Sequence, residues 1–496
     1  MADIFGSLTG WTLVLLVLAL LLAFSFEFVN GFHDTANAVA TVIYTHTLPP
    51  WVAVVWSGLW NLTGVLLSTG LVAFGIIALL PVELVLNVGS HAGFAMVFAL
   101  LVSAIVWNLG TWYLGLPASS SHTLIGSIVG VGLANSLLTK GQSFGDGVNW
   151  GKVQDTFAAL LISPVVGFVC AGALLLLLKL LVKSPELYTA PEGPKPPPPW
   201  IRALLVLTCT GVSFAHGSND GQKGMGLIML ILIGIVPSVY ALNLDLPAAT
   251  IAQIQASSAS VQQSLDGIAG GPATLSAQDA SKDLSEFIKA NGKQTPQTFP
   301  ALAAVNGEIT KELGSKTTLK DVPSEERAAL RSNLYLVGET LGKLDKKKLL
   351  PADSADKLKA YKSSLESITK FIPVWVKFAV ALALGFGTMI GWKRIVVTVG
   401  EKIGKSHLTY GQGACAELIA MFTIFAADRY GLPVSTTHIL SSGVAGTMAA
   451  NGSGLQKETL RNILLAWVLT LPVCVLLGSA LFAFGLRFVD LLVPGH

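Results

Sequence analysis

The sequence predicts an all-α polytopic membrane protein with two inverted repeats with broken helices, about 10–12 transmembrane segments and a polar helical insert. Composition is the first reason, because 52% of the 496 residues are hydrophobic and only 12% are charged. Several apolar runs are long enough to cross a bilayer. The second reason is that two motifs each occur twice, and the third is a polar stretch that interrupts the second repeat.

The duplicated motifs lie in apolar surroundings. The first reads Asn30-Gly31-Phe32-His33-Asp34-Thr35-Ala36-Asn37-Ala38 and returns 186 positions later as His216-Gly217-Ser218-Asn219-Asp220-Gly221-Gln222-Lys223-Gly224. The second reads Gly115-Leu116-Pro117-Ala118-Ser119-Ser120-Ser121-His122 and returns 316 positions later as Gly431-Leu432-Pro433-Val434-Ser435-Thr436-Thr437-His438. The chain is therefore expected to consist of two related halves.

Each half contains five principal apolar segments. They cover 11–29, 51–80, 93–114, 116–138 and 156–182, then 201–216, 373–392, 409–430, 432–450 and 461–493. An odd number of crossings gives the second half the opposite orientation, which is the inverted-repeat arrangement of secondary transporters. The pieces after the acidic motifs, about 35–46 and 221–240, are expected to be either half-helices or spans.

Changes of composition suggest the domain boundaries. Residues 1–182 form the first repeat, 183–199 a proline-rich linker, 200–242 the start of the second repeat, 243–371 a polar helical insert and 372–496 the rest of the second repeat. The two repeat offsets, 316 and 186, differ by 130 positions, which matches the length of the insert.

Short basic loops predict the orientation in the membrane. They fall on one face if the segments alternate, and the positive-inside rule makes that face cytoplasmic. Both termini and the insert are then expected on the periplasmic side. The basic residues are Lys183, Lys195, Arg202, Lys393, Arg394, Lys402, Lys405, Lys457 and Arg461.

Asp34 and Asp220 are the leading candidates for binding a cation or proton. A carboxylate at bilayer depth is costly and usually functional, and the neighbouring glycines, Gly31 and Gly217, could let the helix break so that freed carbonyls add oxygen ligands. The alternative is a structural carboxylate that caps a half-helix.

Two hydroxyl runs are candidates for binding an anion. Each follows Leu-Pro and precedes apolar sequence, as at a helix start, where backbone N–H groups and the positive end of the dipole attract anions. An ordinary helix cap is the alternative. His122 and His438 follow the runs and are equally well interpreted as ligands or as packing residues. The runs are Ser119, Ser120 and Ser121, and Ser435, Thr436 and Thr437.

Other intramembrane charges have less specific interpretations. Glu27 and Glu417 occur in one half each and are expected to be proton carriers or paired structural acids. Asp428 and Arg429 lie together at a segment end, where a boundary ion pair is expected. The net charge of +3 is small and gives no indication of nucleic-acid binding.

At these four motifs the sequence resembles the inorganic phosphate transporter family, called Pit in bacteria, and most closely its low-affinity bacterial members. The resemblance implies a multi-pass protein of the bacterial inner membrane that forms a homodimer and imports inorganic phosphate by symport. It implies no resident cofactor or metal, and it assigns no role to the insert. Phosphate is expected to travel as a neutral complex with a divalent metal such as magnesium, for which Asp34 and Asp220 are candidate ligands.

The resemblance also suggests two groups of site residues. Candidates for phosphate binding, besides the hydroxyl runs, are Asn37, Asn219, Gln222 and Lys223. Candidates for ion coupling are Asp34, Asp220, His33, Asn30, His216 and Glu27.

Two departures from the sodium-coupled members favour protons as the coupling ion. Those members look like Gly-Ala-Asn-Asp-Val-Ala-Asn at the first motif and have Asn at the matching place in the second. Here His33 replaces an amide, and Lys223 lies opposite Asn37. Amide oxygens are good ligands for hard cations, whereas a lysine ammonium repels sodium. Sodium coupling is the alternative.

Three other functions are alternatives. A permease for sulfate or another oxyanion would use the same helix starts, because these recognise charge and shape. An intramembrane serine hydrolase is more remote, since no Gly-x-Ser-x-Gly motif surrounds the serines. A channel would be expected to have a lining ring of charges, which the sequence does not suggest.

Overall fold

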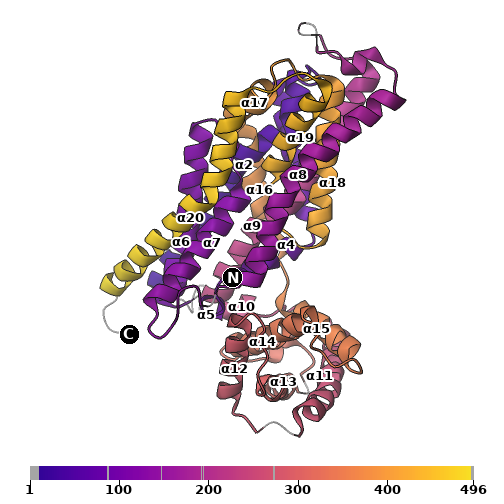
Figure 1. Ribbon diagram of the computed structural model, residues 1–496. Coiled ribbons are helices and arrows are strands. Elements are labelled where there is room, and N and C mark those ends of the chain that lie inside the picture. The colour runs from indigo at the N-terminus through magenta and orange to yellow at the C-terminus, as the bar shows by residue number, and fades with distance from the viewer. Residues whose placement is uncertain are drawn as a thin grey trace.

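The computed structural model is helical throughout the part of the chain that it describes. It describes residues 10–86, 89–146, 148–191, 193, 195–271, 274–314 and 316–492, without the side chains of 34–37, 83 and 489–492. No β-strand occurs in these ranges. An elongated helical body carries a smaller helical insert at one end (Figure 1).

The body contains helices from both repeats. Those of the first are α2 (Gly10–Tyr44), α3 (Pro50–Leu67), α4 (Leu71–Ile77), α5 (Val82–Leu86), α6 (His91–Tyr113), α7 (Ser120–Leu138) and α8 (Trp150–Leu181), followed by the 3₁₀-helix η1 (Pro185–Tyr188). Those of the second are α9 (Pro199–Ile235), α10 (Pro237–Tyr240), α16 (Val374–Gly391), α17 (Lys393–Glu401), α18 (Tyr410–Arg429), α19 (Thr436–Asn451) and α20 (Lys457–Leu492).

The polytopic membrane fold is confirmed. All ten predicted apolar segments are helices, and nine helices in the described ranges are long and apolar enough to span a bilayer. The tenth, α19, has 16 residues and measures about 24 Å at 1.5 Å per residue, less than the ~30 Å hydrocarbon core. It therefore begins inside the membrane if its other end lies at the surface.

The helix breaks do not occur at the acidic motifs, so that part of the prediction is wrong. Helices α2 and α9 continue through both motifs for 35 and 37 residues. The glycines instead allow close helix crossings: a Cβ on Gly31 would lie 2.6 Å from the carbonyl oxygen of Leu384, and one on Gly217 would collide with that of Asn61. The breaks lie at 114–119 and 430–435, just before α7 and α19.

The two halves pack on each other reciprocally. Helix α3 packs on α9 and α16 on α2, and α4 packs on α9 while α17 packs on α2. In the same way α7 packs on α20 and α19 on α8. Such exchanged pairs are what a two-fold axis between two copies of one unit produces. Neither half buries its apolar helix faces without the other.

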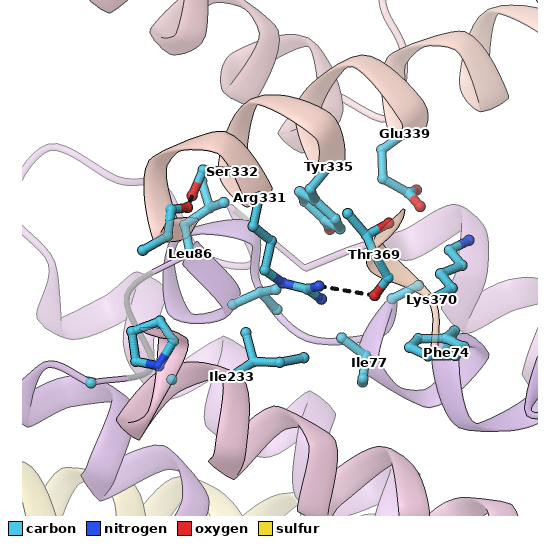
Figure 2. Close-up of a pocket in the computed structure, with 16 residues that line it drawn as sticks. Phe74, Ile77, Leu86, Ile233, Arg331, Ser332, Tyr335, Glu339, Thr369 and Lys370 are labelled. Atoms are coloured by element: carbon cyan, nitrogen blue, oxygen red, sulfur yellow. Dashed lines mark hydrogen bonds between the residues drawn. The ribbon is translucent and has the colours of Figure 1, made fainter. Parts of the chain in front are cut away.

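The insert encloses a separate hydrophobic core, to which Val82 of α5 also contributes. Arg331 anchors it to the body, since its guanidinium donates to the carbonyl oxygens of Ala241 and Thr369, both at 2.9 Å, where the chain enters and leaves the insert. Figure 2 shows the bond to Thr369. Burial lowers the pKa of Arg331 to about 10, so it stays charged at neutral pH. The helices are α11 (Ala248–Ala269), α12 (Ala277–Lys289), α13 (Thr298–Leu313), η2 (Leu319–Asp321), α14 (Arg327–Lys346) and α15 (Ala355–Thr369).

The close crossing at Gly217 predicts a strong effect on stability. Gly217→Ala forces the backbones of α9 and α3 apart, and overpacking of this kind costs about 1–3 kcal/mol. The apparent melting temperature of the purified protein in detergent is expected to fall. Gly110→Ala is the matched control, because a Cβ on Gly110 meets nothing within 4 Å. Equal melting temperatures for the two variants would show that Gly217 is not needed for packing.

Candidate functional site

The two helix breaks meet at the centre of the body. Each ends a helical hairpin, α6–α7 from the first half and α18–α19 from the second. The hydroxyl of Ser121 donates to the carbonyl oxygen of Val434 at 2.6 Å, and the rings of His122 and His438 lie 4.6 Å apart between centroids. The two duplicated Ser/Thr runs, 316 positions apart in sequence, therefore face each other in space.

Glycine explains where both hairpins turn. Gly115 and Gly431 have φ of 68° and 62°, in the left-handed region that glycine adopts without strain. The amide of Leu116 donates to Thr111 O, and that of Leu432 donates to Ala427 O in the same way. These are helix-ending motifs that satisfy the last carbonyls of α6 and α18. The proline that follows each turn keeps the chain extended until the next helix begins.

Serine caps begin the two inner helices. Ser119 Oγ accepts from the amide of His122 at 3.2 Å, and Ser435 Oγ accepts from the amide of His438 at 3.1 Å. The capping interpretation is therefore correct for these two residues. It does not exclude anion binding, because the positive ends of α7 and α19 still point toward each other. All six residues of the two runs are at most 3% exposed.

The second acidic motif forms a buried charged cluster on α9. Asp220 makes an ion pair with Lys223 at 2.7 Å, and His216 Nε2 lies 3.5 Å from the same carboxylate oxygen. The other ring nitrogen of His216 is hydrogen-bonded to Asn61 Oδ1 at 2.7 Å. Asp220 and Lys223 are fully buried. Such an arrangement is stable only while the charges stay paired.

Asp428 joins this motif to the second hairpin, whereas the expectation from sequence was an ion pair with Arg429. Its carboxylate accepts from Ser218 Oγ at 3.0 Å and from Gln222 Nε2 at 2.5 Å. The expected ion pair with Arg429 is not found in the described part of the chain. Position alone offered a signal, because Asp428 directly precedes the turn into the Ser/Thr run.

Asn219 makes a second link from the motif to the hairpin. Its side-chain amide donates to the carbonyl oxygen of Leu432 at 3.3 Å. Gln222 in turn accepts from the amide of Val72 on α4 at 2.9 Å. The predicted residues of this motif therefore contact the elements next to the α18–α19 turn.

The first motif is described only in part. His33 Nε2 donates to the carbonyl oxygen of Asn108 on α6 at 2.7 Å, which parallels the contact of Asn219 with α18–α19. Asn30 is fully buried. The side chains of Asp34 and Asn37 lie outside the described residues.

Glu27 and Glu417 have different surroundings. Glu27 is fully buried against α9, where a Cβ on Gly224 would lie 2.5 Å from its carboxyl carbon. This puts it beside the Asp220–Lys223 pair. Glu417 on α18 instead accepts from Thr208 Oγ1 at 2.5 Å, so it joins two helices as a structural acid. No group of three His, Cys, Asp or Glu suited to a metal ion occurs among the described residues.

Comparison with known proteins gives consistent similarities. A model of the phosphate transporter family matches residues 30–478. The low-affinity inorganic phosphate transporter PitA of Escherichia coli (strain K12) is 44% identical over 506 residues, covering 99% of this chain and 100% of that protein. The corresponding PitB is 42% identical over 504 residues, with the same coverage.

A solved structure shares the fold. It is described as the sodium-dependent phosphate transporter, and it matches with a TM-score of 0.51 over 95% of this chain and 98% of its own. At 17% identity this likeness concerns the fold alone.

The Asp220–Lys223 pair predicts a thermodynamic signature. Asp220→Asn or Lys223→Gln alone leaves one buried charge without its partner, which costs about 3–5 kcal/mol, whereas removing both charges is often nearly neutral. Each single variant is expected to lower the apparent melting temperature, and the double variant to regain most of it.

An exposed ion pair provides the control. Lys320 and Asp245 lie 3.1 Å apart with exposed side chains, so Asp245→Asn is expected to change stability by no more than about 1 kcal/mol. Additive losses in the double variant of Asp220 and Lys223 would contradict a buried ion pair.

Proposed function

The chain belongs to the phosphate transporter family, and from that premise we propose that it imports inorganic phosphate together with protons by alternating access. One observation carries the proposal: the capped starts of α7 and α19 face each other at the centre, with Ser121 bonded across to Val434. A tetrahedral oxyanion between them would meet two positive helix ends and the hydroxyls of both repeats.

Further groups would complete the phosphate site. His122 Nδ1 is buried and has no hydrogen-bond partner in the described part of the chain, so it is suited to the substrate. Asn219, Gln222 and Lys223 lie on α9, where they would complete the cradle from the side. Asn37 is their proposed counterpart in the first repeat.

Protonation of Asp220 would couple the proton to phosphate. As a carboxylate, Asp220 holds the ammonium of Lys223 at 2.7 Å. Once protonated it would release that ammonium, which could then pair with a phosphate oxygen. Protonation of Asp220 and binding of phosphate would favour each other, because the phosphate anion would replace the Asp220 carboxylate as the partner of the Lys223 ammonium. The positive charge of Lys223 also makes this place unfavourable for sodium.

Glu27, His216, His33 and Asn30 would act around this exchange. Glu27 lies beside α9 and His216 lies 3.5 Å from Asp220, so either could pass a proton to it. His33 and Asn30 are buried on α2 at the matching level of the first repeat, and Asp34 is the proposed partner of Asp220 there.

A divalent metal is proposed as cargo with phosphate. Magnesium prefers oxygen ligands and keeps several waters, so a magnesium phosphate complex would need only one or two protein carboxylates. Asp34 is the proposed ligand, because Asp220 is either paired with Lys223 or protonated in this scheme. Neutralising phosphate in this way lowers the cost of carrying it through the membrane.

Alternating access is supported by the closed state of the site. The residues of both Ser/Thr runs and the Asp220 cluster are buried, so phosphate can enter only after a movement. Reciprocal packing suits rocking of one repeat-built bundle against the other. We propose further that the insert faces the periplasm, as the basic loops suggest, and that the protein is a homodimer.

Hydrolysis is disfavoured by two findings. The similar proteins are named as transporters. A nucleophilic serine needs a base that accepts its hydroxyl proton. The hydroxyl of Ser121 instead donates to the carbonyl oxygen of Val434, which is not a base.

The coupling ion can be tested by transport in proteoliposomes. Uptake of labelled phosphate is expected to increase under an inward proton gradient without sodium, and to increase further with magnesium. Asp220→Asn should abolish it. Uptake that does not respond to the proton gradient and requires sodium would overturn proton coupling. Inhibition of uptake by excess sulfate would indicate that the protein accepts other oxyanions as well.

Asp428 provides a test of the contact between α9 and the second hairpin. Asp428→Ala leaves the Ser218 hydroxyl and one of the two N–H groups of Gln222 Nε2 without an acceptor, while the other still bonds to Ser218 O. Each unpaired buried donor costs about 1–3 kcal/mol, and the uptake rate is expected to fall about tenfold or more. Asp146→Ala, which removes an exposed loop carboxylate, should transport normally. Normal uptake by Asp428→Ala would remove this contact from the mechanism.

A further inference from the structure

A cleft of about 1030 Å³ separates the insert from the membrane body. It is lined by α4 with the residues before it, the start of α8, Asn291 after α12, helices α14 and α15 with the residue that follows each, and the turn between α18 and α19. The insert covers one side, and the body forms the floor. Nothing in the transport mechanism above uses this space.

Positive charge predominates in the cleft. Seven lysines and arginines line it against three carboxylates, an excess of four. The carboxylates of Asp155 and Glu366 already have lysine partners. In the described chain, Lys152, Lys347 and Arg429 have no carboxylate within ion-pair distance. The cationic residues are Lys152, Lys343, Lys346, Lys347, Lys362, Lys370 and Arg429.

Contacts across the cleft fix the insert over the body. Lys343 Nζ donates to Asn149 Oδ1 on the body and to Asn291 Oδ1 on the insert, both at 3.2 Å. Lys346 makes an ion pair with Asp155 on α8. Beside the cleft, Figure 2 shows Lys370 and Glu339 at the same boundary. Lys343 and Lys346 are therefore fixed between the insert and the body and are not dispersed on a free surface.

The floor of the cleft is also the cover of the buried site. Arg429, Tyr430 and Gly431 line the cleft and form the turn between α18 and α19. Their neighbours on either side, Asp428 and Leu432, accept hydrogen bonds from the second acidic motif. Only the residues between Gly431 and Ser435 separate the cleft, along the chain, from the start of α19.

We propose that this cleft is a receiving site for inorganic phosphate on the insert side of the membrane. Lys152, Lys347 and Arg429 hold the anion in contact with water until the α18–α19 hairpin moves and admits it to the buried site. The proposal rests on phosphate being the transported ion. A concave surface of one charge sign raises the local concentration of an oppositely charged solute and its rate of association, in a salt-dependent way.

The transport test uses full-length protein in vesicles of phosphatidylcholine alone, with phosphate added on the insert side. The double variant Lys152→Gln/Lys347→Gln is expected to raise the KM for phosphate about five- to tenfold, with kcat unchanged and a weaker dependence of uptake on salt. Lys282→Gln/Lys311→Gln removes two exposed lysines of α12 and α13, helices that contribute no residue to the lining of the cleft, and should leave KM unchanged. Equal changes in both double variants would overturn the proposal, because a general charge effect would explain them.

A binding test separates this site from the central one. Asp220→Asn/Lys223→Gln protein lacks both charges of the central pair and cannot transport, and phosphate titrated into it with detection by ³¹P NMR is expected to show weak binding that adding Lys152→Gln/Lys347→Gln removes. Loss of all binding in Asp220→Asn/Lys223→Gln alone would overturn the receiving site while leaving the proposed function intact. Transport that fails with phosphate in every variant would instead contradict the proposed function.

A lipid headgroup carries the same phosphate chemistry, so vesicle composition is the last comparison. Lipid binding predicts that the unaltered protein and the double variant have equal KM values in phosphatidylcholine, and that added phosphatidylglycerol raises the KM of the unaltered protein alone. That result would show that the cleft binds lipid and would overturn the proposal. A higher KM of the double variant in phosphatidylcholine supports inorganic phosphate as the ligand.

Discussion

Interrupting two helices within a bilayer leaves backbone groups without partners, and the rest of this structure depends on how that constraint is met. Unsatisfied backbone groups in hydrocarbon cost several kcal/mol each, so a break is tolerated only where protein surrounds it. The molecule places both breaks face to face and closes each with a glycine turn and a serine cap. The same solution brings two positive helix ends to one point, which creates the conditions for binding an anion.

The exchanged packing of the repeats follows from the same constraint. A hairpin that stops inside the membrane cannot complete its own surroundings, so α7 packs on α20 and α19 on α8 of the other repeat. Long unbroken helices α2 and α9 pass beside the breaks and carry the charged residues. Glycines at the crossings let these backbones approach. The long helices thus present the charges, whereas the hairpins present the helix starts.

The sequence predicted the features that leave a local or duplicated signal. Leu-Pro before a hydroxyl run identified both inner helix starts, and duplication showed that they belong together. The predicted helix break at Gly31 was wrong because glycine is suited both to a hinge and to a close helix crossing. Only the backbone of Leu384, which faces Gly31 in the structure, shows that this glycine serves the crossing. The role of Asp428 was missed because its partners lie more than 200 positions away and no repeat marks the pair.

The cleft shows why the insert could not be interpreted from sequence. Its charges nearly cancel along the chain, so composition suggests a neutral helical domain. Folding pairs some of these charges and leaves others unpaired. Glu366 forms ion pairs with Lys362 and Lys370, whereas Lys347 lines the cleft without a carboxylate partner among the described residues. The body adds Lys152 and Arg429 to the same space. Lysines of the insert and of the body thus combine into one positively charged region, although neither segment shows an excess of charge in sequence. This region borders the hairpin turn that covers the central site.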